Sequence, residues 1–285
     1  MGAAFLITLR EGLEIALILS ILLAYLDTIG RRDRHRSVWR GAGLAAAASV
    51  GGGLVIFLTA GALSDTSQEA FEGVVSFLAV GVLTWMIFWM RRQARFIKGE
   101  LQQRVDLALA SGSSMALGLL AFFVVLREGL ETALFLFATF RATATDSPAA
   151  GTVGALLGLT TAGVLGYLMY RGAVRLNLRT FFRLTGALLL LVGAGLLASG
   201  VHELQEIGWL PLGEGTAFDI GGVLPDSGPG LPLRALFGYN ANPTWLEFLV
   251  WAGYLLIVGF LFFRPPPKSG KAPVSEPVGV GSRRN

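Results

Sequence analysis

A charged hexapeptide occurs twice inside apolar segments of this sequence. Leu-Arg-Glu-Gly-Leu-Glu stands at residues 9–14, which we call motif 1, and again at residues 126–131, which we call motif 2. Residues three or four positions apart share one face of a helix. In each motif the two Glu side chains therefore point the same way, and the Arg can reach the second Glu across one turn. The spacing predicts two compact groups, each with two carboxylates and one guanidinium.

The depth of both motifs makes these charges costly. With a rise of about 1.5 Å per residue, Gly12 lies about 15 Å from a helix start near Gly2, which is the middle of a bilayer. One charge at that depth costs roughly 2.5–3.5 kcal/mol, so the charges of both motifs cost on the order of 15–20 kcal/mol unless they pair or face water. We therefore expect the two motifs to meet and to have a function beyond packing.

The charge balance of the motifs favours a bound cation. Two carboxylates for each guanidinium leave a net negative charge, and carboxylate oxygens are hard ligands that suit multivalent cations. The chain has no Cys, so thiolate coordination is excluded. We predict as metal ligands Glu11, Glu14, Glu128 and Glu131. We predict as residues that orient them Arg10 and Arg127. Taken alone, the residues also permit a structural ion-pair network or a proton relay.

The sequence has seven apolar segments, each long enough to cross a bilayer, and two of them contain the motifs. The sequence is 53% hydrophobic and 15% charged, with a mean hydropathy of +0.63, whereas soluble domains carry about 25% charged residues. This composition argues against a soluble enzyme. Apolar runs of about 20 residues predict transmembrane helices. The runs lie at about 3–26, 39–63, 70–90, 114–140, 149–170, 180–202 and 245–263.

The positions of the basic residues predict the orientation of the chain. The net charge is +4, but most Lys and Arg residues follow the first, third, fifth and seventh spans, and the alternate connections are acidic. Because cytoplasmic loops carry the excess of Lys and Arg, we expect the N-terminus outside and the C-terminus in the cytoplasm. The basic residues then mark topology, and we expect no nucleic-acid partner.

The repeated motif divides the chain into two units of three spans each, offset by 117 residues. An odd number of spans makes the second unit enter the membrane from the opposite side, which is an inverted-topology repeat. The predicted fold class is an all-α polytopic membrane protein with seven transmembrane helices, a 3+3 inverted repeat plus one C-terminal helix. The transmembrane domain spans 1–264, with repeat one at about 1–92, repeat two at about 114–203, an outer loop at 204–243 and the seventh helix at 244–264.

Several segments outside the spans have recognisable patterns. Residues 93–109 carry apolar residues at helical spacing beside basic ones, which predicts an amphipathic helix on the inner face. Thr244 and Glu247 have the spacing of a helix cap. Residues 265–285 begin with three Pro and lack apolar periodicity, so we expect a disordered cytoplasmic tail.

Polar residues near the outer ends of the third and sixth spans form a candidate outer access path for ions: Glu72, His202, Glu203 and Glu206.

The doubled Arg-Glu-Gly-Leu-Glu on a seven-span chain resembles the high-affinity iron permease family, which contains fungal oxidase-coupled ferric permeases and bacterial EfeU-type permeases. Phe-Glu-Gly at residues 71–73 and Val-His-Glu-Leu-Gln-Glu at residues 201–206 are similar to the bacterial branch. The resemblance covers about residues 1–264. It implies that both motifs carry iron through the membrane, with ferric iron favoured over ferrous. It also implies two separate partners, an extracytoplasmic iron-binding protein and a haem peroxidase.

These observations together predict an iron-uptake permease of the cytoplasmic membrane. It would be no enzyme, would hold no permanent cofactor, and would have iron ions and the lipid bilayer as its partners. Two alternatives stay open. One is a proton-coupled carrier or a transporter of lead or another heavy metal on the same fold. The other is a membrane anchor for a redox partner that transports nothing itself.

Overall fold

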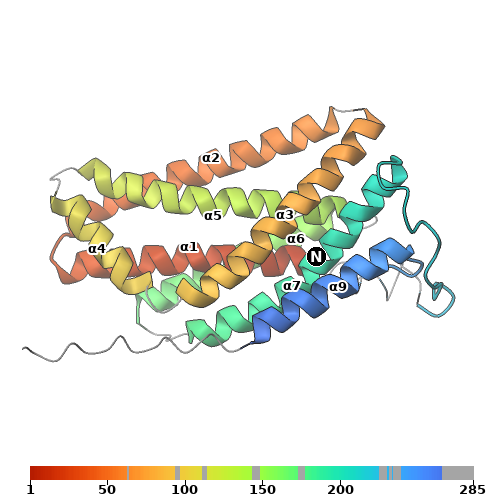
Figure 1. Cartoon of the computed structure of the whole chain (residues 1–285). Helices are drawn as coiled ribbons and strands as arrows, with labels where there is room; N and C mark the ends of the chain where they lie inside the picture. Colours follow the sequence, from red (N-terminus) through yellow and green to blue (C-terminus); the bar gives the residue numbers. More distant parts are fainter. Residues whose placement is uncertain are drawn as a thin grey trace, which may run out of the picture.

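The computed structural model is an elongated bundle of helices (Figure 1). It describes residues 1–62, 64–93, 97–110, 114–142, 148–172, 177–224, 230, 233 and 239–264. The helices in these residues are α1 (Gly2–Thr28), α2 (His35–Gly61), α3 (Asp65–Gln93), α4 (Ile97–Ala110), α5 (Ser114–Ala142), α6 (Pro148–Tyr170), α7 (Leu178–Glu206) and α9 (Trp245–Phe263), with a short 3-10 turn, η1 (Arg32–Arg34). The predicted tail at 265–285 lies outside the described residues.

The long helices coincide with the apolar segments of the sequence. Among the described residues, five helical stretches are long and apolar enough to cross a membrane, and they coincide with α2, α3, α6, α7 and α9. Helices α1 and α5 are as long, at 27 and 29 residues, but each carries the three charges of a motif, more than an ordinary span holds. The all-helical prediction is confirmed for the described residues. The seven-span repeat topology and the orientation of the termini stay predictions.

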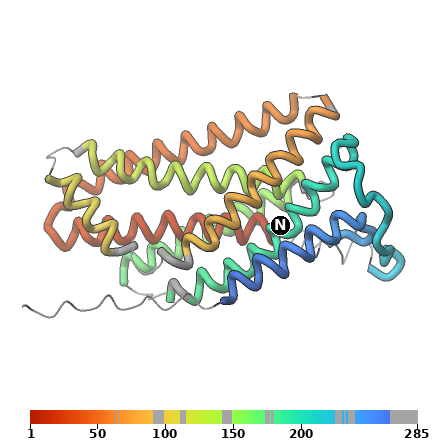
Figure 2. Tube along the Cα trace, in the orientation of Figure 1, coloured from red at the N-terminus to blue at the C-terminus, as the bar shows by residue number. Residues whose placement is uncertain are grey.

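The helices pack in pairs that join the two halves of the chain. Helix α1 packs along α6, α2 along α5 and α3 along α7, while α9 packs on α7 (Figures 1 and 2). Small residues make the closest contacts, as is usual between helices in membranes. A side-chain carbon on Gly41 of α2 would overlap the carbonyl of Gly118 in α5, and one on Gly158 of α6 would overlap the hydroxyl of Thr8 in α1. Each of the first three long helices thus has its main partner in the second half.

The glycines of the two motifs lie at two of these close contacts. A Cβ on Gly12 would stand 2.8 Å from the Cβ of Ala162 in α6, and a Cβ on Gly129 would stand 2.6 Å from the Cβ of Ser49 in α2. Separations under about 3 Å do not occur for real Cβ atoms. These two glycines therefore leave the space that a neighbouring helix occupies. Motif 1 admits α6, and motif 2 admits α2.

Helix α4 covers one end of the bundle, at the left in Figure 1, where α1 ends and α5 begins. Leu101 and Val105 are buried in an apolar cluster with residues of α1 and α5. The hydroxyl of Tyr25 in α1 donates a 2.7 Å hydrogen bond to Asp106 of α4. The predicted amphipathic helix is therefore present, and its apolar face is covered by protein. We call this end of the bundle the α4 end.

Candidate metal site

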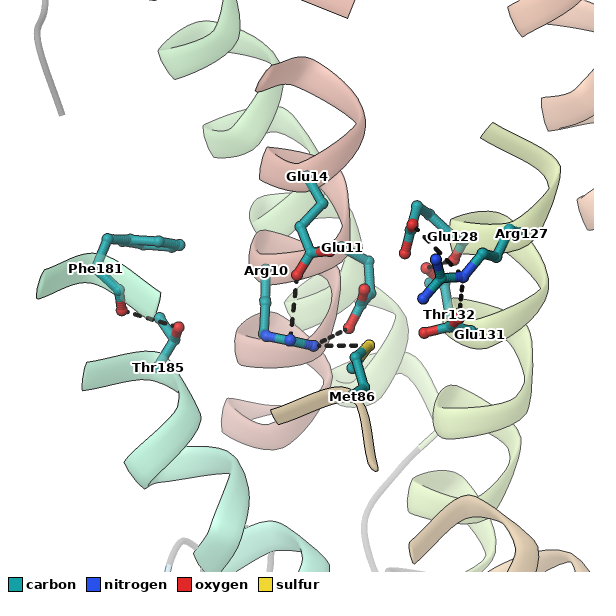
Figure 3. Close-up of polar contacts among 10 residues, drawn as sticks. All are labelled: Arg10, Glu11, Glu14, Met86, Arg127, Glu128, Glu131, Thr132, Phe181 and Thr185. Carbon is teal, nitrogen blue, oxygen red and sulfur yellow. Dashed lines mark hydrogen bonds and ion pairs between the residues drawn. The ribbon is translucent and has the colours of Figure 1, made fainter. Parts of the chain in front are cut away.

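Motif 1 holds an arginine whose side chain is only 2% exposed. Arg10 Nη1 donates a 2.8 Å hydrogen bond to Glu11 Oε1, and its Nη2 lies 3.2 Å from Glu14 Oε1. The same Nη1 lies 3.1 Å from the sulfur of Met86, which α3 contributes (Figure 3). One guanidinium therefore holds both carboxylates of its own helix, as expected from the spacing. Helix α3 covers this guanidinium through Met86.

Motif 2 has the same residues in a more open setting. Arg127 Nε donates to Glu131 Oε1 at 2.9 Å and lies 4.0 Å from Glu128 Oε1, and its side chain is 37% exposed. The guanidinium stacks 4.7 Å from the ring centroid of Trp89 on α3, an attractive cation–π arrangement. The two motifs are identical in sequence but not in environment, because α3 offers a thioether to one Arg and an indole to the other.

Three carboxylates from the two motifs converge between α1 and α5 (Figure 3). Glu11, Glu128 and Glu131 each bring one oxygen to within 4.8 Å of the others. The first two are buried and the third is partly buried. Among the described residues, the Oε2 atom of each is enclosed and has no hydrogen-bond partner. Enclosed polar atoms normally find a partner, so these three oxygens are available to bind one.

The spacing of the three oxygens suits a small cation. A first-row divalent ion binds carboxylate oxygen at about 2.0–2.2 Å, so two oxygens on opposite sides of it lie about 4.4 Å apart. Small rotamer adjustments would bring the observed spacing into this range. The fourth predicted ligand, Glu14, is outside this group of three, and its Oε1 lies 3.2 Å from Arg10 Nη2. The structure thus brings together three of the four predicted ligands.

A cavity of about 140 Å³ extends from the motifs towards the α4 end. Glu14, Arg127 and Glu128 line one part of it, and Glu100 and Arg104 of α4 line another. Leu17, Ile18 and Val124 are among its apolar wall residues. Carboxylates of both motifs therefore face a space that α4 borders.

The predicted outer access path is divided between two groups of residues at the end opposite α4. Glu72 of α3 is buried, lies 2.9 Å from Nη1 of Arg141 on α5, and accepts a 2.8 Å hydrogen bond from Gln68. Glu72 is thus held by an ion pair between α3 and α5. Glu203 is partly buried and Glu206 is exposed.

The second group joins α7 to α9. His202 Nδ1 lies 2.8 Å from Glu247 Oε1, and His202 Nε2 lies 3.4 Å from Glu206 Oε1. The amide of Asn240 donates to the other oxygen of Glu247 at 2.9 Å. The backbone N–H of Glu247 also donates to Thr244 Oγ1 at 3.2 Å, which confirms the predicted cap. Glu247 therefore contributes to the helix cap and also binds His202.

Sequence reasoning missed several residues that contact the predicted site residues, among them Met86, Trp89 and Arg141. Met86 and Trp89 carry no charge and resemble ordinary span residues, so no local signal marks them. Arg141 does have a signal, because it is one of few basic residues expected on the acidic outer side. An isolated Arg in that position predicts a buried or partly buried carboxylate partner, which is Glu72 in the structure.

The family model for the iron permease FTR1 family matches residues 1–266. The chain belongs to this family. It is 42% identical to the ferrous iron permeases EfeU of Shigella sonnei (strain Ss046) and Escherichia coli O157:H7, over 95% of this chain and 98% of each relative. It is 39% identical to ferrous iron permease EfeU of Yersinia pestis, over 93% of this chain and 94% of the relative. No solved structure matches the chain. Membership in a permease family and the apolar helices make it a multi-pass protein of the cytoplasmic membrane and a transporter, as the sequence predicts.

Proposed function

We propose that this permease carries iron across the cytoplasmic membrane, and that motifs 1 and 2 together form its ion site at mid-depth. The observation that supports this most strongly is the group of three converging carboxylates from two helices, each with an enclosed oxygen that lacks a hydrogen-bond partner. Carboxylates in such a position repel one another, and a bound cation removes that repulsion. An ion-pair network built only for stability would leave no such oxygens.

We infer that the cargo is Fe²⁺, although the family resemblance favoured Fe³⁺. The four Glu and two Arg side chains of the motifs carry a net charge of −2 when all are ionised. A divalent ion makes the loaded site neutral, whereas a trivalent ion leaves one positive charge in a medium where a single charge costs about 2.5–3.5 kcal/mol. The relatives are named ferrous iron permeases, in agreement with this balance.

The two halves of the chain are proposed to form an inverted repeat around the ion site. The pairing of α1 with α6 and of α5 with α2 supports this, because exchanging the halves converts one pair into the other. The same exchange replaces α3 by α7 and α7 by α3, so this pair stays the same. The contacts of the motif glycines follow the same exchange. In such folds one half commonly rocks against the other to expose a central site alternately on each side.

We place the α4 end in the cytoplasm, as the distribution of Lys and Arg indicates. Iron would then arrive at the opposite end, past Glu72 and the group that contains His202, Glu203 and Glu206. The pair of Glu72 with Arg141 would have to open for Glu72 to contact the ion. An extracytoplasmic iron-binding protein and a haem peroxidase remain predicted partners, supported only by the family resemblance.

Uptake of radioactive iron into cells that express single variants tests this proposal. Glu131→Gln removes one charge from the three-carboxylate group and keeps the side chain's shape. The matched control is Glu214→Gln, on an exposed residue of the loop after α7. We expect loss of uptake in Glu131→Gln and normal uptake in the control, at equal expression. Wild-type uptake in Glu131→Gln would show that motif 2 does not bind the transported ion.

Separately, uptake of Fe³⁺ under conditions that prevent reduction would contradict the ferrous assignment.

A further inference from the structure

The cavity between the motifs and α4 is lined by carboxylates of both. Glu14 and Glu128 line it beside the motifs, and Glu100 lines it from α4. Its volume of about 140 Å³ is several times the roughly 30 Å³ that a water molecule occupies in the liquid. A hydrated or partly hydrated cation therefore fits. Glu128 is buried, and its Oε2 has no hydrogen-bond partner among the described residues, so this oxygen can bind a cation, although Arg104 and Arg127 also line the cavity.

The packing of α4 fixes Glu100 at this position. Leu101 and Val105 are buried against α1 and α5, and Asp106 accepts the hydrogen bond from Tyr25. These contacts set the rotation of α4, and residue 100 then borders the cavity. The side chain of Glu100 is 42% exposed, so the cavity reaches the surface where this carboxylate stands.

Glu100 is paired with an arginine one helical turn away, as is a carboxylate of each motif, although in α4 the Glu precedes the Arg. Arg104 Nη2 donates to Glu100 Oε1 at 2.6 Å, and the two residues are four positions apart. The pairs Arg10 with Glu14 and Arg127 with Glu131 have the same separation along their helices. In all three pairs a guanidinium forms an ion pair with a carboxylate that borders the site or the cavity. A cation can take the place of each guanidinium, and the Arg can return when the cation leaves.

We propose that Glu100 is an exit-side ligand for the transported divalent cation, and that Arg104 competes with the cation for this carboxylate. The cation passes from Glu14 and Glu128 through the cavity to Glu100 and then enters the cytoplasm. This proposal rests on the proposed function, since it assumes that a cation occupies the motifs. It assigns to α4 a part in ion release in addition to its packing role.

The first test compares uptake of radioactive Fe²⁺, kept reduced with ascorbate, in three variants at equal expression. Glu100→Gln is expected to lower the maximal rate by about tenfold, in the range seen when a group supporting a metal site is removed. The control is Asp33→Asn, which removes an exposed carboxylate of η1 that does not line the cavity. Glu131→Gln reports on the proposed function. If Glu100→Gln transports normally while Glu131→Gln does not, the exit ligand is refuted and the proposed function stands. If both transport normally, the proposed function itself fails.

The second test detects the cation in the cavity and does not depend on the transport rate. The chain has no Cys, so Val124→Cys places a single thiol on the cavity wall. Inside-out vesicles are treated with a small positively charged methanethiosulfonate reagent and increasing Fe²⁺. We expect Fe²⁺ to slow the modification, and we expect the protecting concentration to rise about tenfold when Glu100→Gln is added. Equal protection in both backgrounds, or no protection in either, would overturn the proposal.

Discussion

Identical arginines in the two motifs should contribute unequally to stability. Arg10→Gln removes the partner of two carboxylates that are almost fully enclosed, since the side chains of Arg10, Glu11 and Glu14 are at most 3% exposed. Removing one member of a buried ion pair costs about 3–5 kcal/mol. In Arg127→Gln the lost guanidinium was 37% exposed and its partner Glu131 12% exposed. Arg127 lines the cavity, where water can compensate the groups left behind, so we expect a cost of about 1 kcal/mol.

Thermal unfolding of the purified variants in one detergent, without added metal, measures this difference. For a chain of this size 1 kcal/mol shifts Tm by about 2–4 °C. Arg10→Gln should therefore lower Tm by about 10 °C, and Arg127→Gln by about 3 °C. Arg10→Lys keeps the charge but loses the two-pronged contact with Glu11 and Glu14, so its Tm should lie between that of Arg10→Gln and the wild type.

The order of the two variants decides the outcome of this test. Equal losses, or a greater loss in Arg127→Gln, would refute the inference that the motifs lie in different environments. Equal losses are what the sequence alone predicts, because the two hexapeptides are identical.

Two further predictions concern helix packing and orientation. Gly129→Val should push α2 away from α5, because even a Cβ would stand 2.6 Å from that of Ser49. Overpacking costs about 1–3 kcal/mol, so Tm should fall, whereas Gly163→Val, where no heavy atom lies within 4 Å of the added Cβ, should leave Tm almost unchanged. A lower Tm in the Gly163 variant alone would contradict the observed packing. Second, an impermeant maleimide should label Ser67→Cys in intact cells and Asp33→Cys only in inside-out vesicles. The reverse pattern would overturn the predicted orientation.

The positions of the helices were predictable because they depend on local properties of the chain. Runs of about 20 apolar residues marked the long helices, and the spacing of Thr244 and Glu247 marked the start of α9. Residues 93–109 contained the signal for α4, because apolar and basic residues alternate there with a helical period. Contacts inside each motif were predictable for the same reason, since Arg10 and Glu14 lie one turn apart.

The meeting of the two motifs was expected from the cost of their charges, but the other contacts between distant helices could not be predicted from the sequence. Nothing in motif 1 indicates that Met86 lies beside its Arg, and nothing in motif 2 indicates the stacking on Trp89. The exclusion of Glu14 from the three-carboxylate group depends on the relative rotation of α1 and α5, which periodicity does not determine. The same holds for Glu100, whose distance from the motifs along the chain conceals the cavity that they share.

The location of the bound metal ion tests the central claim most directly. Crystals of the protein soaked with Fe²⁺ under anaerobic conditions, measured on both sides of the iron absorption edge, would give the ion's position from anomalous differences. We predict a peak between α1 and α5, bonded to oxygens of Glu11, Glu128 and Glu131. An iron peak elsewhere, with these three carboxylates unoccupied, would contradict the account.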